Sequence, residues 1–556
     1  MNKEEHFVYT QSTVDIKRSK FIVNSKWTGD IYHGDLVPLE VLEILPGDSF
    51  KYDVAAFIRT ATPPIAPLMS KIQFSIAAFY VPKRLVWFKT KEFYGENTEG
   101  YGIQSEILEP RTTNDNISVS KSSAVGAYKR SLATYFGLVH QNAGSLSGKH
   151  SPIALNPIRA YLQCYNDWFR NENFHAPYLW DHSQTGDANR AIGSLGGGNI
   201  TGQGQLPQVC KMLDKWTSAL PWAQKGNPVL LPLGDIAPVA MLHQDTPYVA
   251  DVAADTAFDV KNNYLIDKDA VGTKSNLYVS KDLGGGDYVA GAMVADLTAA
   301  TAASVNELRL AFATQRYLEA LARTGSKYRE YIKGMFGVSI GDTTAQMAEY
   351  LGGMTIDLNI DQVLQQTGYA PGGTTTLGAP GASSTSASAG HLFVKSFDEP
   401  GYLVVVGYAK HVRSYGQGIS ELFQKHELFD YYNPKFANIG EIAMKENGIY
   451  FDGDVSKDNV RFGFQEAWQE YKHIPDRVVG ALNPANSTSF DFWSLAEKFA
   501  SAPTLNGDFL KEDRDNITRC LAGGSSSPDY FVDIKFNRTM VRPMPLYSIP
   551  GLIDHH

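Results

Sequence analysis

The sequence predicts a mainly β fold, with strands at both ends of the chain and helical insertions between them. Apolar and polar residues alternate over residues 50–54, and the same alternation returns over residues 532–536. A period of two places one set of side chains on one face of a strand. Because one sheet system closed by both ends is simpler than two separate sheets, we expect residues 1–90 and 391–556 to form a single core.

Two further features extend this pattern. Residues 72–76 alternate in the same way, which predicts another strand near the front. Near the other end, the apolar runs 392–397 and 402–408 are separated by Glu399-Pro-Gly401. A short spacer with Pro and Gly between two such runs is typical of a β-hairpin, so we expect the two runs to pair with each other.

Residues 91–390 follow a different pattern and are predicted to form inserted loops and helices. Asn156 precedes Pro157, which matches an N-cap residue followed by proline in the first helical turn. Apolar residues then recur at helical spacing as far as Phe169. The first predicted helix therefore begins at this Asn-Pro pair.

A second helix is predicted to follow Ser304. This serine forms a capping-box pattern with Glu307, and Gly325 occupies the position of a C-terminal glycine. Residues 369–390 are rich in Gly, Ser, Thr and Ala. Such a composition predicts an exposed or poorly ordered loop.

Composition limits the class of protein. Of the 556 residues 43% are hydrophobic, there are three cysteines, and the formal net charge is −9. The acidic balance argues against binding of nucleic acid through bulk positive charge, and the widely spaced cysteines predict no disulfide framework and no zinc–thiolate site. No run approaches ~18 consecutive apolar residues, so no membrane insertion is expected. The first residues lack an apolar signal core, which predicts a protein made and used in a cytoplasm.

No catalytic constellation is recognisable, so we predict no catalytic residue, no metal site and no cofactor. The run that ends at Lys149 differs from a P-loop because His150 follows the lysine in place of Ser or Thr. Glu466 and Glu470 lie four residues apart, and a helix would place both on one face as a pair of hydrolytic carboxylates. This pair keeps open an alternative class, a β-sandwich carbohydrate-binding or hydrolytic protein.

Several motifs carry a resemblance to one protein family. They occur in one order along nearly the whole chain: Pro38-Leu-Glu-Val-Leu-Glu-Ile-Leu-Pro46, Asn156-Pro-Ile-Arg-Ala160, Leu220-Pro-Trp-Ala-Gln-Lys-Gly226, Gly463-Phe-Gln-Glu-Ala-Trp-Gln-Glu-Tyr471 and Val541-Arg-Pro-Met-Pro-Leu-Tyr547. With these motifs the chain resembles the major capsid proteins of the Microviridae, small single-stranded-DNA bacteriophages, and most closely their gokushovirus-like branch. It departs from the family pattern after Val338, where Ser339-Ile-Gly-Asp342 replaces a Ser-Pro-Asp-Ala-Arg-like run.

The resemblance implies an eight-stranded antiparallel viral jelly roll that carries long inter-strand insertions. It also implies self-assembly into a small icosahedral shell around a circular single-stranded DNA genome. The insertion at about residues 236–303 would build a surface protrusion that contacts a host surface receptor. A small basic DNA-associated phage protein and a scaffolding or internal phage protein would be further partners. The chain would then be located in the virion, after assembly in the host bacterial cytoplasm.

Two short segments are candidate contact sites within such a shell. Basic residues near the N-terminus could meet DNA phosphates from the shell interior; they are Lys17, Arg18 and Lys20. Near the C-terminus, prolines fix an extended apolar arm suited to lie on another subunit. The residues expected to form this intersubunit arm are Arg542, Pro543, Pro545, Tyr547 and Pro550.

Four basic residues are further candidates for DNA contact. Lys83 and Arg84 lie near Trp87, and Arg538 lies near Arg542, where the C-terminal arm begins. An aromatic neighbour would allow a base to stack beside the phosphate contact. The alternative for each of these side chains is an intersubunit salt bridge or a solvated surface position.

Overall fold

The computed structural model describes residues 17–96, 107–112, 130, 132–138, 153–185, 187–188, 192–194, 199–200, 206–229, 239–243, 246–249, 264–271, 274–282, 288–290, 292–295, 305–364, 378, 380–486 and 488–547. The chain divides into two compact units. The first consists of Met1–Ala223 and Thr324–His556, and the second of Gln224–Arg323. The first unit contains the two large sheets of the fold.

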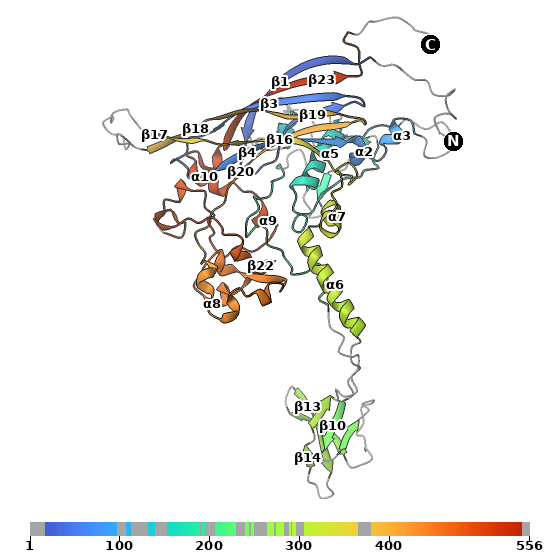
Figure 1. Cartoon of the computed structure of the whole chain (residues 1–556), viewed down its shortest axis with the longest axis vertical. Helices are drawn as coiled ribbons and strands as arrows, with labels where there is room; N and C mark the ends of the chain where they lie inside the picture. Colours follow the sequence, from blue (N-terminus) through green and yellow to red (C-terminus); the bar gives the residue numbers. More distant parts are fainter. Residues whose placement is uncertain are drawn as a thin grey trace. The chain divides into compact units, whose positions relative to one another are not determined.

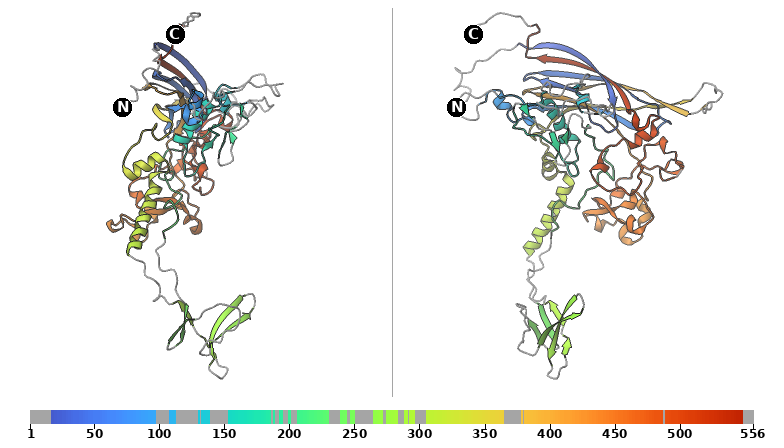
Figure 2. Two further views of the ribbon diagram at one scale, coloured as in Figure 1. Left: turned by 90° about the vertical axis from the view of Figure 1, so that its right-hand side faces the viewer. Right: turned by 180° about the vertical axis from the view of Figure 1, so that it is seen from behind.

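Four antiparallel strands form the first sheet, in the order β1 (Ser19–Ile31), β23 (Tyr530–Arg542), β3 (Ser49–Thr60) and β19 (Ser386–Ser396). β1 and β23 come from opposite ends of the chain and pair over their whole length, with Ser19 opposite Arg542 and Ile31 opposite Tyr530. Figures 1 and 2 show these two strands, blue and red, side by side. The two ends of the chain therefore share one sheet.

The second sheet is also antiparallel, in the order β16 (Glu349–Asp357), β4 (Ile72–Pro82), β20 (Gly401–His411) and β2 (Val37–Ile44). The predicted hairpin between residues 392–397 and 402–408 is wrong. β19 pairs with β3 in the first sheet, whereas β20 pairs with β4 and β2 in the second. The continuous apolar run of β20 suits a central strand that is covered on both faces.

An apolar core lies between the two sheets. In β3, Phe50, Tyr52 and Val54 are buried, whereas the residues between them are not, as their alternation predicts. Tyr52 stacks on Phe393 of β19, with ring centroids 5.5 Å apart. Full burial of a large apolar side chain stabilises a fold by ~1.5–3 kcal/mol, so this alternation fixes the register of the sheet.

A helix covers the face of the second sheet that points away from the first. α5 (Asn156–Cys164) continues into a π-helical turn, η1 (Tyr165–Phe169). The predicted proline lies in the first turn of α5, but the N-cap residue is Leu155 instead of Asn156. Phe169 packs edge-on against Tyr408 of β20, with ring centroids 5.2 Å apart. This packing explains why β20 is buried along nearly its whole length.

Short helices, 3₁₀ turns and small strands make up the rest of the first unit. Its helices are α2 (Lys83–Val86), α3 (Thr90–Phe93), α4 (Leu132–Tyr135), α7 (Tyr328–Phe336), α8 (Val455–Asp458), α9 (Gly507–Leu510) and α10 (Asp515–Cys520). Its 3₁₀ turns are η3 (Glu421–Gln424), η4 (Leu428–Asp430), η5 (Pro434–Phe436), η6 (Glu446–Gly448), η7 (Gln469–Tyr471), η8 (Gly480–Leu482), η9 (Asp491–Trp493) and η10 (Gly524–Ser526). Its small strands are β5 (Arg111–Thr112), β6 (Tyr178–Leu179), β7 (Asp187–Ala188), β8 (Ile192–Ser194), β9 (Asn199–Ile200), β21 (Glu441–Lys445) and β22 (Arg461–Glu466). Among the described helices, none is both long and apolar enough to cross a membrane.

A further hairpin joins β17 (Ile360–Leu364) to β18 (Pro380–Ser384). β18 and the start of β19 occupy residues 380–390, so the prediction of a loop over 369–390 is wrong for this part. Residues 369–377 lie outside the described residues. Ser384 and Ser386 are buried, which shows that these small side chains pack within the sheet region.

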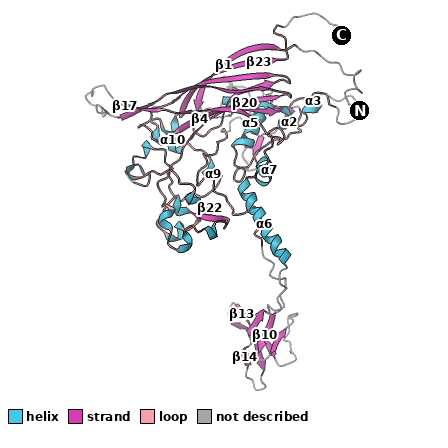
Figure 3. Ribbon diagram, in the orientation of Figure 1, coloured by secondary structure: helices cyan, strands magenta, loops and turns pink. Residues whose placement is uncertain are grey.

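The second unit contains two three-stranded antiparallel sheets, which Figure 3 shows in magenta. One sheet has the order β11 (Thr246–Val249), β10 (Val239–His243) and β15 (Ala292–Ala295), and the other β12 (Tyr264–Val271), β13 (Lys274–Asp282) and β14 (Tyr288–Ala290). α6 (Val305–Thr324) follows and ends before Gly325, whose φ of +92° matches the predicted C-terminal glycine. Ser304 lies outside the described residues. Over the described residues the structure is mainly β, and its sheets are antiparallel except for the short parallel pair of β5 and β7, which confirms the predicted mainly β class.

Candidate interaction surfaces

Residues 415–490 of the first unit form a loop-rich lobe, called here the 415–490 lobe. Local hydrogen bonds fix its 3₁₀ turns. The Asn433 side chain accepts a hydrogen bond from the Lys435 amide at 3.0 Å, and Asp430 accepts one from the Glu427 amide at 2.8 Å. Because polar caps hold these turns, their apolar side chains are free to point outward.

The surface of this lobe carries an unusual number of exposed apolar side chains. Leu428 is 83% exposed, and Phe423 and Ile474 are each 73% exposed. The same lobe also exposes Leu422, Phe429, Tyr431, Tyr432, Ile439, Tyr471 and Val479. These ten residues are called the apolar patch below. Patches of this kind mark interaction sites, because a soluble chain otherwise keeps large apolar side chains apart or buried.

Part of the apolar patch lines a cavity of about 700 Å³. Its walls include Trp216, Leu422, Tyr431 and Ile474. The Lys425 ammonium lies 4.2 Å from the centroid of the Tyr471 ring and donates a hydrogen bond to the Tyr471 hydroxyl at 2.8 Å. The cavity is therefore mainly apolar with a few fixed polar groups, as is common for binding surfaces.

A second apolar core supports the cavity from beneath. Trp216 packs edge-on against Phe462, with ring centroids 5.6 Å apart. Tyr415 lies in the same core and donates a hydrogen bond from its hydroxyl to Asp214. A close-packed base of this kind holds the wall above it in one shape, so the cavity is preformed.

The predicted DNA-contacting residues lie where β1 begins. Lys17, Arg18 and Lys20 are all exposed. β1 is an edge strand of the first sheet, so one side of its backbone is unpaired within the sheet. The structure brings these three residues together on the surface, and their contact with DNA stays a prediction.

The predicted C-terminal arm begins with a residue that is held by its own chain. The Arg542 guanidinium donates a hydrogen bond to the Glu43 carbonyl oxygen at 2.9 Å and lies 5.4 Å from the centroid of the Phe50 ring. These contacts fix the point at which the arm leaves the first sheet.

The arm itself exposes its side chains beyond that point. Pro543 is half-buried, Pro545 is exposed and Tyr547 is 79% exposed. Pro550 lies outside the described residues. An exposed apolar segment attached to a fixed anchor is suited to bind a second surface, and this role stays a prediction.

Two of the further candidates for DNA contact are buried. The side chain of Lys83 is 4% exposed and pairs with Glu109. Burial lowers the pKa of the Lys83 ammonium. The side chain of Arg538 is also 4% exposed, and its Nη1 lies 2.6 Å from Glu40 Oε1. Neither side chain reaches the surface, and each forms an ion pair within its own chain in place of the expected intersubunit or solvated position.

The two glutamates considered as a hydrolytic pair do not share a helix. Glu466 ends β22, Glu470 lies in η7, and Trp468 between them has a φ of +66°. Glu466 pairs with Lys472 at 2.7 Å, and Glu470 with Lys425 at 3.2 Å. The expected helix face is wrong, because the left-handed residue breaks any helix here and each carboxylate has its own cation.

Comparison with known proteins matches the chain over almost its whole length. The family model described as "Capsid protein (F protein)" matches residues 10–552. The chain is 32% identical over 562 residues to "Capsid protein VP1" of Spiroplasma virus 4, which covers 97% of this chain and 96% of that protein. It is 31% identical over 547 residues to "Capsid protein VP1" of Bdellovibrio phage phiMH2K, with the same coverage of both chains. The chain belongs to the phage capsid F-protein family, and the resemblance to Microviridae capsid proteins is confirmed.

Proposed function

We propose that the chain is the major subunit of a small icosahedral phage shell, which self-assembles and encloses a circular single-stranded DNA genome. The observation that carries this proposal, beside family membership, is the apolar patch on the 415–490 lobe. A single copy exposes these side chains to water, and identical copies around symmetry axes would bury them. Each contact is modest, but many identical contacts act together in a closed shell.

The two large sheets support an eight-stranded viral jelly roll as the shell core. Two four-stranded antiparallel sheets enclose one apolar core. Long insertions separate β4 from β16 and β20 from β23. The sequence proposes residues 1–90 and 391–556 as this core. The jelly roll proposed here also includes β16 and the start of β19, which lie within residues 91–390.

The proposal assigns a partner to each predicted contact surface. Packaged DNA would meet the basic start of β1, and the C-terminal arm would lie on a neighbouring subunit. Residues 236–303 fall inside the second unit, which would contact a host surface receptor. A small basic DNA-associated phage protein and a scaffolding or internal phage protein would join the assembly in the host bacterial cytoplasm.

Substitutions in the apolar patch test the assembly role. Leu428→Ser and Phe423→Ser together remove two of its most exposed side chains. Because both side chains point into solvent, the fold should be unchanged, as circular dichroism and the thermal unfolding midpoint would report. Electron microscopy of the expressed variant should then show no closed shells.

Val455→Ser provides a matched control. Val455 lies on α8 of the same lobe and is 75% exposed, but it is not part of the apolar patch. This variant should assemble as the unmodified chain does. Normal shells from the Leu428→Ser/Phe423→Ser variant would remove the main structural support for the proposal.

A further inference from the structure

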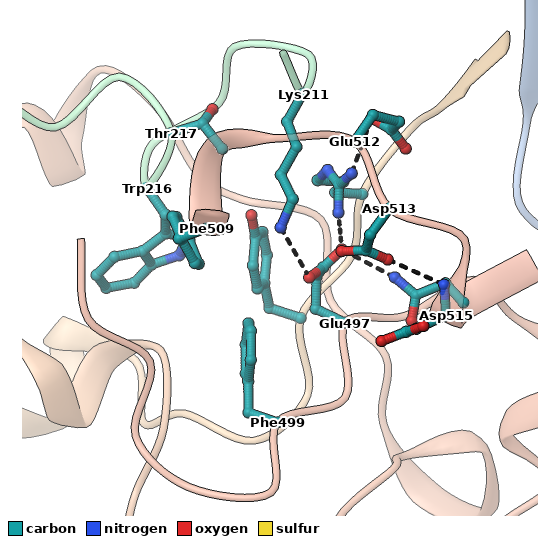
Figure 4. A network of polar contacts seen from close by, with 12 residues as sticks. Lys211, Trp216, Thr217, Glu497, Phe499, Phe509, Glu512, Asp513 and Asp515 are labelled. Atoms are coloured by element: carbon teal, nitrogen blue, oxygen red, sulfur yellow. Dashed lines mark hydrogen bonds and ion pairs between the residues drawn. The ribbon is translucent and has the colours of Figure 1, made fainter. Parts of the chain in front are cut away.

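Three side chains that could ligate a metal ion meet in the interior of the first unit. His33 follows β1, His411 is the last residue of β20, and Glu512 lies between α9 and α10. All three have no exposed surface. Figure 4 shows the neighbouring polar network, in which Lys211 points toward Glu497 not far from Glu512.

The three ligand atoms form a small triangle. His33 Nε2 lies 2.9 Å from Glu512 Oε1, and His411 Nδ1 lies 2.7 Å from the same oxygen. The two imidazole nitrogens lie 3.0 Å from each other. Glu512 is held as a carboxylate by Arg413, whose Nη2 lies 2.8 Å from the other oxygen, Oε2.

No placement of protons on the two imidazoles makes all three edges of this triangle favourable hydrogen bonds. If both histidines donate to the carboxylate oxygen, their two N–H groups face each other across 3.0 Å. If only one of them donates, the lone pair of the other nitrogen faces the carboxylate oxygen. One edge of the triangle is therefore repulsive in every arrangement with an ionised Glu512, and buried repulsive contacts between polar groups are costly.

We propose that His33, His411 and Glu512 bind a divalent first-row transition-metal ion. Such an ion accepts all three lone pairs at bond lengths of about 2.0–2.2 Å. At a bond length of about 2.1 Å, ligands separated by 90° lie about 3.0 Å apart, and tetrahedral ligands about 3.4 Å apart. The observed edges match ligands on one face of an octahedron, which is the arrangement of two histidines and one carboxylate in open metal sites.

The surrounding groups are arranged as an outer shell for this ion. His33 Nδ1 lies 2.9 Å from the Tyr530 hydroxyl, whose oxygen can accept the proton of this nitrogen and so leave the Nε2 lone pair for the ion. His411 Nε2 makes no hydrogen bond to a described residue and lies 3.9 Å from Glu497 Oε1. With its proton on this outer nitrogen, each neutral imidazole turns a lone pair to the ion, and an outer partner such as the Tyr530 hydroxyl orients a metal ligand.

The charges of the pocket set a limit on the ion. Glu512 and Glu497 bring two negative charges, and Arg413 and Lys211 bring two positive ones, with Lys211 Nζ 3.3 Å from Glu497 Oε2. A weakly ligated cation would be repelled by the two basic groups, so nitrogen ligands that bind transition metals well are required. The ion would join three segments distant in sequence, which gives it a structural role, independent of the proposed shell function.

The test uses the full chain purified from expressing cells, stripped with a chelator and dialysed. Titration with Zn²⁺, followed by elemental analysis, should give one ion per chain and raise the thermal unfolding midpoint. Co²⁺ in place of Zn²⁺ should give the weak visible absorption of a six-coordinate ion. His33→Ala should abolish both signals.

Two milder variants keep the test decisive if His33→Ala does not fold. Tyr530→Phe keeps the ring and removes the hydroxyl beside His33, so it should weaken Zn²⁺ binding roughly 10- to 100-fold. Tyr80→Phe removes a similar buried hydroxyl, which donates to the Glu399 carbonyl oxygen at 2.7 Å, and should leave Zn²⁺ binding unchanged. Absence of bound ion in the unmodified chain, or equal binding by the two variants, would overturn the metal site and leave the shell function untouched.

Discussion

The strongest single prediction concerns Arg538, which links the two large sheets. This residue lies on β23 of the first sheet, and its partner Glu40 lies on β2 of the second. The guanidinium also donates to the Val23 carbonyl oxygen at 3.1 Å and to the Ser25 hydroxyl at 2.5 Å. We predict that Arg538→Met destabilises the first unit severely, although methionine would fill much of the same space.

The magnitude follows from what the substitution leaves behind. The side chain of Glu40 is only 14% exposed, so its carboxylate would remain largely buried without a cation. Removal of one partner from a buried ion pair costs roughly 3–5 kcal/mol. Hydroxyl donors remain on Glu40, including that of Tyr52. We therefore expect about 3 kcal/mol, which is more than a ~100-fold change in the unfolding equilibrium.

Urea unfolding of the unassembled chain would measure this loss, with the transition midpoint falling at an unchanged slope. The double variant Glu40→Gln/Arg538→Met removes the buried charge together with its partner. It should be less destabilised than the sum of the two single variants. A loss below about 0.5 kcal/mol for Arg538→Met, as surface substitutions give, would refute the reasoning.

Three further predictions concern the arm, the DNA contacts and pH. A chain that ends at Arg542 keeps β23 intact and should fold normally, but it should not form stable shells in a sedimentation assay; stable shells would show that the arm is dispensable. Substitution by glutamine at the three basic residues around the start of β1 should lower the salt dependence of single-stranded DNA binding by about 2 in log–log slope, at ~0.7 per phosphate contact; these residues are Lys17, Arg18 and Lys20. An unchanged slope would place the DNA elsewhere. Burial lowers the pKa of Lys211 to about 8 from 10.5. Between pH 8 and 10.5 the unfolded chain binds more protons than the folded chain, so the free energy of unfolding rises with pH by up to ~1.4 kcal/mol per pH unit. Below pH 8 the lysine is charged in both states, and the full cost of burying its charge lowers the free energy of unfolding. Lys211→Met should remove this rise in urea midpoints measured from pH 7.5 to 9.5, and an equal rise in both chains would contradict it.

Much of the β architecture was predictable because alternation reports burial directly. β3, β4 and β23 each carry apolar residues at every second position, and each lies where the sequence predicts a strand. β16 lacks that signal because it contains Gly352 and Gly353. A Cβ at Gly352 would lie 2.1 Å from the Leu392 carbonyl oxygen, so the glycine permits a close approach of β19.

The partners of buried polar groups were not predictable from local pattern. Arg538 lies in an alternating sequence that predicts a strand beside an exposed arm. Nothing in that pattern indicates Glu40, which only the fold brings next to Arg538. His33, His411 and Glu512 are each separated by a hundred residues or more, so no motif spacing relates them. The prediction of a hairpin between β19 and β20 was wrong for a similar reason, since a turn signal does not show whether the next strand belongs to the same sheet.

The central claim is that this chain forms the shell of a phage particle. Electron microscopy of particles purified from infected or expressing cells, with their protein and nucleic acid composition read by mass spectrometry and nuclease digestion, tests it most directly. We predict closed icosahedral particles made mainly of this chain and filled with single-stranded DNA. A small soluble species of this chain, absent from particles whose shell is another protein, would contradict the account.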